Sequence, residues 1–314
     1  MKWIKKGRIF DHSTFSIPWF KKNAMVPVPY LVDKETLRLF VTMCDEDTVG
    51  RIGYVDVDPN NPSRVLGYSE KPVVDIGPDG AFDDNGVVTS SVLEADGKLY
   101  LYYSGYQLCV KVPYLIFSGV AVSEDKGKTF TKYSGSAPIL DRIDGEIGSR
   151  CAPYVLRERD GYRMWYTSDS QSGWVESGGK RKPLYDLKTL KSQSPVEWPR
   201  EAGDVAITFK DSDEHGIAKC SVWSELGKYR ALYSIRSHSK GYRLGYAESA
   251  DGVSFDRKDS EIGIDVSETG WDSEMVAFPE RFELMGRAYL FYCGNNYGKD
   301  GIGYAELEGA TQHG

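Results

Sequence analysis

The sequence is poor in the side chains that build redox, metal and covalent-catalysis centres. Of its 314 residues, five are cysteines and four are histidines. The cysteines form no CxxC pair, and no His, Asp and Glu residues follow the spacing of a metal site. Glycine-rich phosphate loops and the nucleophile elbow GxSxG are also absent. We therefore expect no metal ion, no cofactor and reduced, mostly buried thiols, as in a cytoplasmic protein.

The balance of charge and the lack of long apolar runs limit the partners of this chain. Acidic residues outnumber basic ones, 46 Asp and Glu against 39 Lys and Arg, which gives a net charge of −7. This sign speaks against nucleic acid or an anionic membrane as the main partner. No apolar run reaches the length of a transmembrane helix, and Met1–Phe10, although basic, lacks the apolar stretch of a signal peptide. We expect a soluble protein that neither binds nucleic acid nor enters a membrane.

One recurring motif, called here the Tyr-rich phrase, dominates the chain. It begins with a glycine or a substitute, continues through a basic residue and an aromatic run, and ends in a small polar residue. The copies are DGKLYLYYS (Asp96–Ser104), DGYRMWYTS (Asp160–Ser168), LGKYRALYS (Leu226–Ser234), MGRAYLFYC (Met285–Cys293) and the degenerate TLRLFVTMC (Thr36–Cys44). They recur roughly every 60 to 66 residues, so the chain holds about five units of a repeat architecture.

Each unit has the pattern of a short antiparallel meander. An apolar segment precedes every Tyr-rich phrase, and a third segment follows it, often with a turn at Asp-Gly or Asp-Lys-Gly. Tyr, Val and Phe favour strands, and helical periodicity is nearly absent. Five such units arranged radially make an all-β, five-bladed β-propeller, which we predict as a single domain over residues 1–314. Because the last unit lacks a fourth strand, we expect residues 1–10 to complete that fifth blade and close the ring.

Acidic residues gather in the loops that would enter the first strand of each blade. In a propeller these loops lie together at one face, and here they contain Asn23, Asp83, Asp84, Glu146, Arg150, Glu214, His215, Asp272 and Glu274. A single acidic turn residue is usually only a solvated cap, but here a carboxylate recurs at the same position in four of the five blades. Converging carboxylates separate one another's pKa values, so one site can supply both an acid and a base. His215 lies in an EHG triplet at the same predicted entrance.

Aromatic residues in predicted loops point to a carbohydrate. Most of the 21 Tyr and 7 Trp must pack between blades, but five lie in loops beside Gly, Ser or Asn: Trp19, Tyr106, Trp174, Trp271 and Tyr297. Flat aromatic faces near amides and carboxylates suit a sugar ring, which offers apolar C–H faces and many hydroxyls. We also expect residues 169–179 to form a mobile loop between two strands of the third blade.

Over essentially its whole length the sequence resembles the five-bladed propeller enzymes of glycoside hydrolase families 43, 32 and 130. The segment Phe82–Tyr106 is similar to the second-blade signature of families 32 and 43, and Gly119–Tyr133 is similar to a hairpin common to the group. Segments within Glu214–Phe255 and Gly270–Glu308 look like a family-43-like subgroup associated with bacterial surface-polysaccharide gene clusters. The resemblance implies a propeller fold and a carbohydrate or activated sugar as the substrate.

The resemblance also implies roles for particular loop residues. In family 43, blade 1 supplies an Asp base, blade 2 a positioning Asp and blade 3 a Glu acid. Asp84, or its neighbour Asp83, matches the blade 2 position, and Glu146 matches the blade 3 position. Blade 1 departs from the pattern because Asn23 stands there, and an amide cannot take a proton from water. An inverting hydrolase would therefore need a base from elsewhere in the chain.

Three functions stay open on the sequence alone. The first is a glycosidase-like enzyme, with Glu146 as the acid, Asp84 orienting the substrate, and Glu214 or Glu274 as the replacement base. The second is a glycosyltransferase or phosphorylase, which needs cations for a phosphate: Arg150, His215, Lys219, Arg236 and Arg243. The third is a sugar-binding propeller without catalysis, because a fold alone does not establish a function. The candidate catalytic residues are Asp84, Glu146, Glu214, His215 and Glu274, and the candidate substrate-binding residues are Asn23, Asp83, Arg150, Lys219, Arg236, Trp271 and Asp272.

Overall fold

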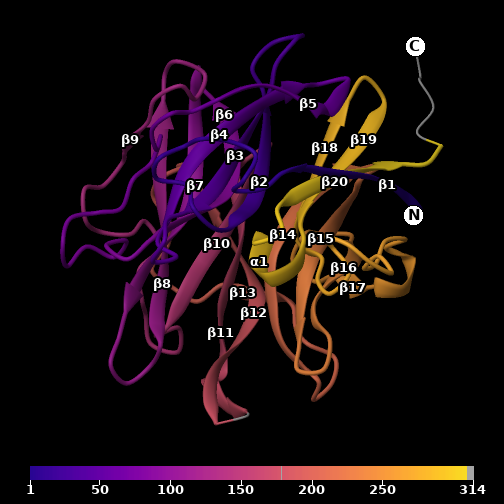
Figure 1. The fold of residues 1–314 in the computed structure, drawn as a ribbon. Coiled ribbons are helices and arrows are strands. Elements are labelled where there is room, and N and C mark those ends of the chain that lie inside the picture. The colour runs from indigo at the N-terminus through magenta and orange to yellow at the C-terminus, as the bar shows by residue number, and fades with distance from the viewer. Residues whose placement is uncertain (178, 310–314) are drawn as a thin grey trace.

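The protein is built almost entirely from β-strands. The structure is a computed structural model that describes residues 1–177 and 179–309. Its strands follow one another around the molecule, interrupted by one 3-10 turn (Asp259–Glu261) and a single-turn helix, α1 (Asn295–Gly298) (Figure 1). No helix in these ranges has the length and apolar composition needed to cross a membrane.

Antiparallel pairing divides the strands into five groups of four. Group 1 consists of β2 (Ala24–Leu31), β3 (Leu37–Cys44), β4 (Gly50–Asp58) and β5 (Asn61–Tyr68). Group 2 consists of β6 (Val87–Ala95), β7 (Lys98–Leu108), β8 (Tyr114–Ser123) and β9 (Thr131–Lys132). Group 3 consists of β10 (Ser149–Glu158), β11 (Gly161–Ser177), β12 (Lys180–Ser192) and β13 (Asp204–Ile207). Group 4 consists of β14 (Glu214–Glu225), β15 (Lys228–Ser237), β16 (Gly241–Ser249) and β17 (Asp256–Arg257). Group 5 consists of β18 (Ala277–Leu284), β19 (Arg287–Cys293), β20 (Ile302–Leu307) and the N-terminal β1 (Trp3–Phe10).

Neighbouring groups meet through their first strands. β2, β6, β10, β14 and β18 contact one another in this order, and β18 also contacts β2. Groups 2, 3 and 4 are further joined into one twelve-stranded sheet by short parallel bridges, β8 with β10 and β12 with β14. The result is a nearly all-β, propeller-like fold.

The Tyr-rich phrase forms the second strand of every group, where both faces of the strand are covered. All eight residues of β3 are buried, and alternate side chains point to opposite sides. Leu39 and Val41 pack against Tyr289 and Phe291 of group 5, whereas Phe40 packs in the cluster that contains side chains of group 2. The core therefore lies between the groups, which explains the aromatic content of the phrase.

The N-terminal strand belongs to the last group, although the two are far apart in the sequence. β1 pairs antiparallel with β20, from Trp3 opposite Leu307 to Phe10 opposite Ile302. The backbone N–H of Glu308 also donates to the carbonyl of Lys2 at 2.9 Å. The pairing predicted for residues 1–10 is confirmed.

Every first strand carries a β-bulge at about the same level. The pairing registers shift after Met25, Thr89, Cys151, Ala218 and Ala277. Four non-glycine residues in these bulges have a positive φ: Val26 (51°), Ala152 (50°), Lys219 (27°) and Phe278 (57°). Such angles are strained for residues with a side chain, and bulges of this kind often adjoin functional sites.

Side chains from the preceding group hold four of these bulges, and we call these contacts the latches. The backbone N–H of Ala152 donates to Ser104 Oγ at 2.8 Å, and that of Phe278 donates to Ser234 Oγ at 2.8 Å. In the same way Val26 donates to Cys293 Sγ at 3.1 Å, and Thr89 donates to Thr42 Oγ1 at 2.8 Å. Ser104, Ser234 and Cys293 are the small polar residues that end the Tyr-rich phrase, so this feature of the repeat joins one group to the next.

Two further expectations can be compared with the fold. The five cysteines are free, and all but Cys109 are buried. The loop expected over residues 169–179 is wrong for most of that segment, because β11 and β12 continue as a hairpin with Trp174 opposite Pro183 and Val175 opposite Lys182. Residue 178 lies outside the described residues. The hairpin matters for the site, since Trp174 lies on it.

Candidate functional site

A pocket of about 400 Å³ lies where the bulged first strands meet. This volume falls in the range of small-molecule sites. All five groups line it, through residues at or beside the bulges: Val26, Thr89, Ala152, Lys219 and Phe278. Each bulge therefore contributes a residue at or beside it to the pocket wall.

Aromatic side chains form much of the pocket wall. They are Tyr106, Tyr114, Trp174, Tyr185, Tyr242, Phe278 and Tyr297. Tyr114 bridges two of the rings, with centroid distances of 5.6 Å to Tyr106 and 5.9 Å to Trp174. Burial raises the pKa of the Tyr106 and Tyr242 phenols well above their usual value, so both hydroxyls stay protonated and can donate hydrogen bonds. Three of the five aromatic residues singled out from the sequence, Tyr106, Trp174 and Tyr297, are in this wall.

The charged side chains among the described lining residues are Lys219 and Arg236; no Asp or Glu is among them. Lys219 is buried and forms an ion pair with Glu280, and its Nζ also donates to the Cys220 carbonyl at 2.9 Å. Ser221 Oγ donates to the other Glu280 oxygen at 3.1 Å. Burial raises the pKa of Glu280, although the Lys219 charge opposes this shift. The positive charge of Lys219 is therefore already compensated from behind the wall.

Arg236 differs from Lys219 in having no carboxylate partner among the described residues. Its Nη1 donates to Tyr185 Oη at 3.0 Å, and its guanidinium lies 5.7 Å from the centre of the Tyr242 ring. Tyr185 Oη and Tyr242 Oη are 3.2 Å apart. Arg236 lines the pocket, and a guanidinium has five N–H donors, so it can bind an anionic or hydroxyl-rich ligand there.

The carboxylates predicted from the sequence lie in separate clusters within their own groups. Asp83 is fully buried and accepts from Lys132 Nζ at 2.6 Å and from Tyr103 Oη at 3.1 Å. Asp272 accepts from Lys5 Nζ at 2.7 Å and from Tyr292 Oη at 3.0 Å. In both clusters the tyrosine is the next-to-last residue of the Tyr-rich phrase.

Group 3 has a similar cluster with one more cation. Glu146 is 1 % exposed and lies 2.6 Å from Arg150 Nε and 2.8 Å from Lys188 Nζ. Tyr166 Oη donates to both of its oxygens at 3.1 and 3.2 Å. Arg150 also donates to the carbonyls of Asp141 and Glu201, so its contacts lie within the group.

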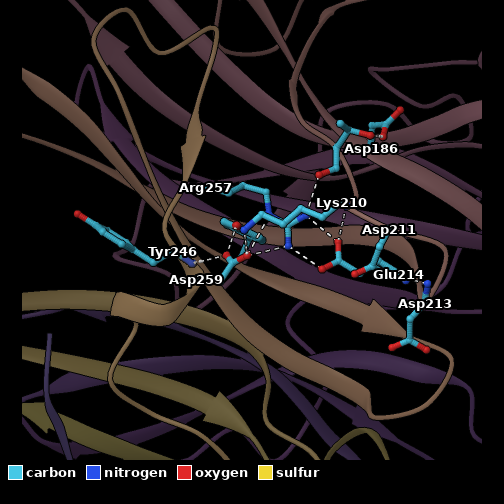
Figure 2. Close-up of polar contacts among 10 residues, drawn as sticks. Asp186, Lys210, Asp211, Asp213, Glu214, Tyr246, Arg257 and Asp259 are labelled. Atoms are coloured by element: carbon cyan, nitrogen blue, oxygen red, sulfur yellow. Dashed lines mark hydrogen bonds and ion pairs between the residues drawn. The ribbon is translucent and has the colours of Figure 1, made fainter.

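In group 4 the carboxylate that binds the tyrosine is Asp259, which follows the last strand of the group instead of preceding the first (Figure 2). Asp259, which follows β17, accepts from Tyr233 Oη, from Lys210 Nζ at 2.9 Å and from Arg257 Nη2 at 2.9 Å. Glu214 binds the same Arg257 through two contacts, 2.6 Å to Nη1 and 2.9 Å to Nη2. Glu214 is thus neutralised by a guanidinium at the outer part of its group.

The sequence-based expectation that these acids converge is therefore corrected. Asp83, Glu146, Glu214 and Asp272 do not line the pocket, because a cation and, in most cases, a tyrosine of the same group hold each one. Their repetition reflects a repeated way of fixing the loop before the first strand. The roles predicted for them in catalysis and substrate binding stay untested predictions.

The remaining predicted residues have diverse environments. Asp84 accepts from the Gly80 backbone N–H at 2.9 Å, outside the pocket lining. Asn23 Nδ2 donates to the carbonyls of Asn296 and Tyr297 at 2.8 and 3.0 Å, which positions α1 and its pocket-lining tyrosine. Trp271 stacks on Tyr292 with centroids 5.2 Å apart and belongs to the core of group 5 rather than to the pocket. Glu274 is exposed and lines a second pocket beside the first.

His215 lies next to the aromatic pocket, at the start of β14. It is 2 % exposed, its Nδ1 lies 3.3 Å from the Pro183 carbonyl, and its ring stacks on His238 with centroids 4.4 Å apart. Burial lowers the pKa of His215 to about 4, and the nearby Arg236 charge contributes to the shift. The imidazole is neutral near pH 7, and Nδ1–H donates to Pro183, which leaves Nε2 as an acceptor.

One carboxylate near the pocket was not singled out from the sequence. Asp169 is buried and accepts from the backbone N–H of Gly148 and from Ser149 Oγ, both at 2.5 Å. Gly148 and Ser149 line the pocket, so Asp169 supports this part of its wall. Asp169 directly follows a Tyr-rich phrase, whereas the candidate residues predicted from the sequence come mainly from the loops before the first strands. In residues 1–177 and 179–309 no three His, Cys, Asp or Glu side chains gather in a way that could hold a metal ion.

Known proteins with similar sequences come from Mycobacterium tuberculosis. The uncharacterized proteins Rv1502 and MT1551, from two strains, are each 32% identical to this chain over 308 residues, which is 98% of this chain and 100% of the relative. The chain belongs to their family. No family model matches it.

Solved structures similar to this chain include glycoside hydrolases. One describes family 130 of mannoside phosphorylases as containing glycoside hydrolases that target β-1,2 mannosidic linkages in Candida mannan; its TM-score is 0.73 at 15% identity, over 98% of this chain and 94% of the other. A thermostable family-43 glycoside hydrolase has a TM-score of 0.65 at 14% identity, over 94% and 93% of the two chains. At this level of identity the likeness shows the fold alone, and this chain has the propeller-like fold of these glycoside hydrolases.

Proposed function

We propose that this protein is a carbohydrate-active enzyme that acts on a glycosidic linkage of a sugar bound in the aromatic pocket. The observation that carries the proposal is the pocket wall itself, in which protonated phenols and Trp174 surround a space of about 400 Å³. Aromatic faces cover the apolar C–H faces of a sugar ring, and phenol hydroxyls bind its oxygens. The fold shared with glycoside hydrolases adds support.

The charges around the pocket favour glycosyl transfer or phosphorolysis over hydrolysis by two carboxylates. Hydrolysis of the usual kind needs two carboxyl groups about 5 to 9.5 Å apart on either side of the linkage. The described lining residues include no carboxylate, whereas Arg236 is available for a phosphate. A transferred or phosphorolysed sugar needs such a cation and no water-activating base.

Hydrolysis is the second candidate, and Asp169 is the residue that favours it. Its carboxylate lies directly behind Gly148 and Ser149 of the pocket wall. Asp169 is the acid that this candidate uses, with His215 Nε2 as an acceptor in the adjoining pocket.

Product analysis separates these reactions. The protein is incubated with a panel of manno- and gluco-oligosaccharides, with and without inorganic phosphate, and with nucleotide-activated sugars. Sugar 1-phosphates or elongated glycans support the proposal, and free reducing sugar in water alone supports the second candidate. Saturation-transfer NMR on the same panel measures binding, with Tyr185→Phe and Tyr242→Phe as pocket variants and Tyr133→Phe, on the exposed surface, as a control. Binding without turnover of any substrate in the panel would identify a non-catalytic sugar-binding protein, and no binding at all would contradict the proposal.

We further propose that the five groups are the blades of one closed propeller domain, with β1 locking the last blade. The first-strand contacts and the pairing of β1 with β20 support this arrangement. A cytoplasmic location fits a reaction on activated sugars. Cell fractionation checks the location.

A further inference from the structure

A second pocket adjoins the aromatic pocket and is rich in basic side chains. Arg236, Tyr242 and Tyr297 line both, so the two spaces share a wall. The second pocket adds Lys182 from β12, His215 from β14 and His238 after β15. β12, β14 and β15, which are neighbours in the sheet, and the turn after β15 thus place four basic side chains around one space.

Three of these side chains are in contact with one another. Lys182 Nζ lies 3.4 Å from His238 Nδ1, and the His238 ring stacks on His215. Lys182 and Arg236 have no carboxylate ion pair among the described residues. Glu274 is the acidic residue in the lining, and Asp213 lies behind the cluster, held by the hydroxyls of Ser237 and Ser239. Two cations, Lys182 and Arg236, thus line one partly buried space without a carboxylate ion pair, an arrangement that an anion would stabilise.

We propose that the pocket between β12, β14 and β15 binds a phosphate group that belongs to, or reacts with, the sugar in the neighbouring aromatic pocket. The sugar in this inference rests on the proposed function, whereas the phosphate rests on the basic side chains of the second pocket. The planar guanidinium of Arg236 offers several N–H donors to phosphate oxygens, and Lys182 supplies a second full charge. Since Arg236 faces both pockets, the phosphate would lie against the sugar, where a 1-phosphate or an attacking inorganic phosphate must be.

A carboxylate is a weaker match for this arrangement. A uronic acid carries a single charge and two oxygens, whereas the cluster presents charged donors from two strands, Lys182 from β12 and Arg236 from β15. Phosphate offers more oxygens and a charge of about −1.5 to −2 near pH 7. The same chemistry can arrive on a sugar or as free inorganic phosphate, and the experiment separates the two.

The test is isothermal titration of the full chain with inorganic phosphate, glucose 1-phosphate, glucuronate and a neutral oligosaccharide found to bind. Arg236→Gln and Lys182→Met are compared with Arg200→Gln, a distant arginine whose side chain is 80% exposed. We expect Arg236→Gln to weaken phosphate binding at least about tenfold and Lys182→Met about three- to tenfold, with Arg200→Gln within about twofold of wild type. Lys182→Met keeps the test decisive if Arg236→Gln fails to fold. Added NaCl should weaken phosphate binding more than binding of the neutral oligosaccharide.

The outcomes separate the inference from the proposed function. Three results would overturn the inference: wild type binds neither phosphate probe, Arg236→Gln and Arg200→Gln bind phosphate equally, or glucuronate alone binds in a way that depends on Arg236. None of these results would affect the binding of the neutral sugar. Phosphate binding with no saccharide binding would leave the anion site and remove the carbohydrate function. If phosphate and the saccharide bind at the same time, free phosphate is the ligand of the basic pocket. If glucose 1-phosphate competes with phosphate and with the saccharide, the ligand is a sugar phosphate.

Discussion

The carboxylate clusters of the groups and the central pocket use similar residue types in opposite ways. In groups 2 to 5 an acid, a tyrosine and a cation neutralise one another inside the group, as Asp83, Tyr103 and Lys132 do. In the pocket, tyrosines surround Arg236, which forms no ion pair with a carboxylate of the described residues. The clusters repeat from group to group, whereas the pocket wall differs at every bulge. In a repeat protein, the repeated polar contacts therefore stabilise the units, and the chemistry is to be sought where the units differ.

The largest effect should come from removing residues 1–10. This deletion removes the whole of β1 from β20 and takes Lys5 from Asp272, which leaves a carboxylate uncompensated in the buried cluster of group 5. We expect a loss of about 4 kcal/mol or more, with all spectroscopic probes of unfolding shifting together. Urea unfolding followed by fluorescence and circular dichroism measures this. A truncated protein that unfolds at the wild-type midpoint would show that β1 is dispensable.

The second prediction concerns a cluster directly. Glu146→Gln leaves Arg150 and Lys188 without their counter-charge in a buried site, so we expect the free energy of unfolding to fall by about 3 to 5 kcal/mol. Glu124→Gln breaks an exposed pair with Lys98 and should change nothing measurable. The fraction of Glu146→Gln that stays folded should still bind the sugar with wild-type affinity. A stable Glu146→Gln protein that binds sugar but has lost turnover would instead make Glu146 catalytic.

The third prediction uses pH at the edge of the pocket. The folded pKa of His215 is about 4, below its unfolded value of 6.5, so the unfolded chain binds more protons between these values. Stability should therefore fall by about 2 kcal/mol as the pH drops from 6.5 to 4. His215→Asn should flatten this part of the profile, and His12→Asn serves as the control. Unfolding midpoints at pH 7, 6 and 5 measure the difference; identical profiles for wild type and His215→Asn would contradict it.

The smallest effect should appear at the latches. Ser104→Ala and Ser234→Ala each remove the acceptor of a bulge N–H, which should cost about 1 to 2 kcal/mol. Ser168 ends the corresponding phrase of group 3, but its buried Oγ has no hydrogen-bond partner in the part of the chain that the structure describes. Ser168→Ala should therefore be neutral or slightly stabilising. Thermal unfolding of the three variants tests the contrast, and an equal loss in all three would rule out the latch as its cause.

The sequence predicts the fold better than it predicts the site, for a physical reason. Strand positions follow from local patterns: the Tyr-rich phrase forms β3, β7, β11, β15 and β19, and Trp3–Phe10 forms β1. The pocket depends on bulges such as Val26 and Phe278, whose positive φ leaves no mark in the residue types. A one-residue insertion in a strand changes which side chains face inward, so alternation cannot assign them.

The acidic loops illustrate the second limit. The sequence shows that the acidic residues recur at one position in the repeat, but it does not show their partners. The partners are Lys132, Lys188 and Lys5, which come from other strands of the sheets. The pocket residues Tyr114, Tyr185 and Tyr242 lie in third strands, away from the loops that were searched. Lys219 and Arg236, by contrast, were chosen from the sequence and do line the pocket.

The latches define which segment of this chain could be exchanged between relatives. A chimera cut between two groups would separate Ser104 from Ala152, or Ser234 from Phe278, and mismatched partners would meet at the new junction. The natural unit for recombination therefore overlaps two groups, running from the second strand of one to the first strand of the next. A pocket grafted with such overlapping modules should keep its backbone shape. A pocket grafted with modules that are cut between two groups should not.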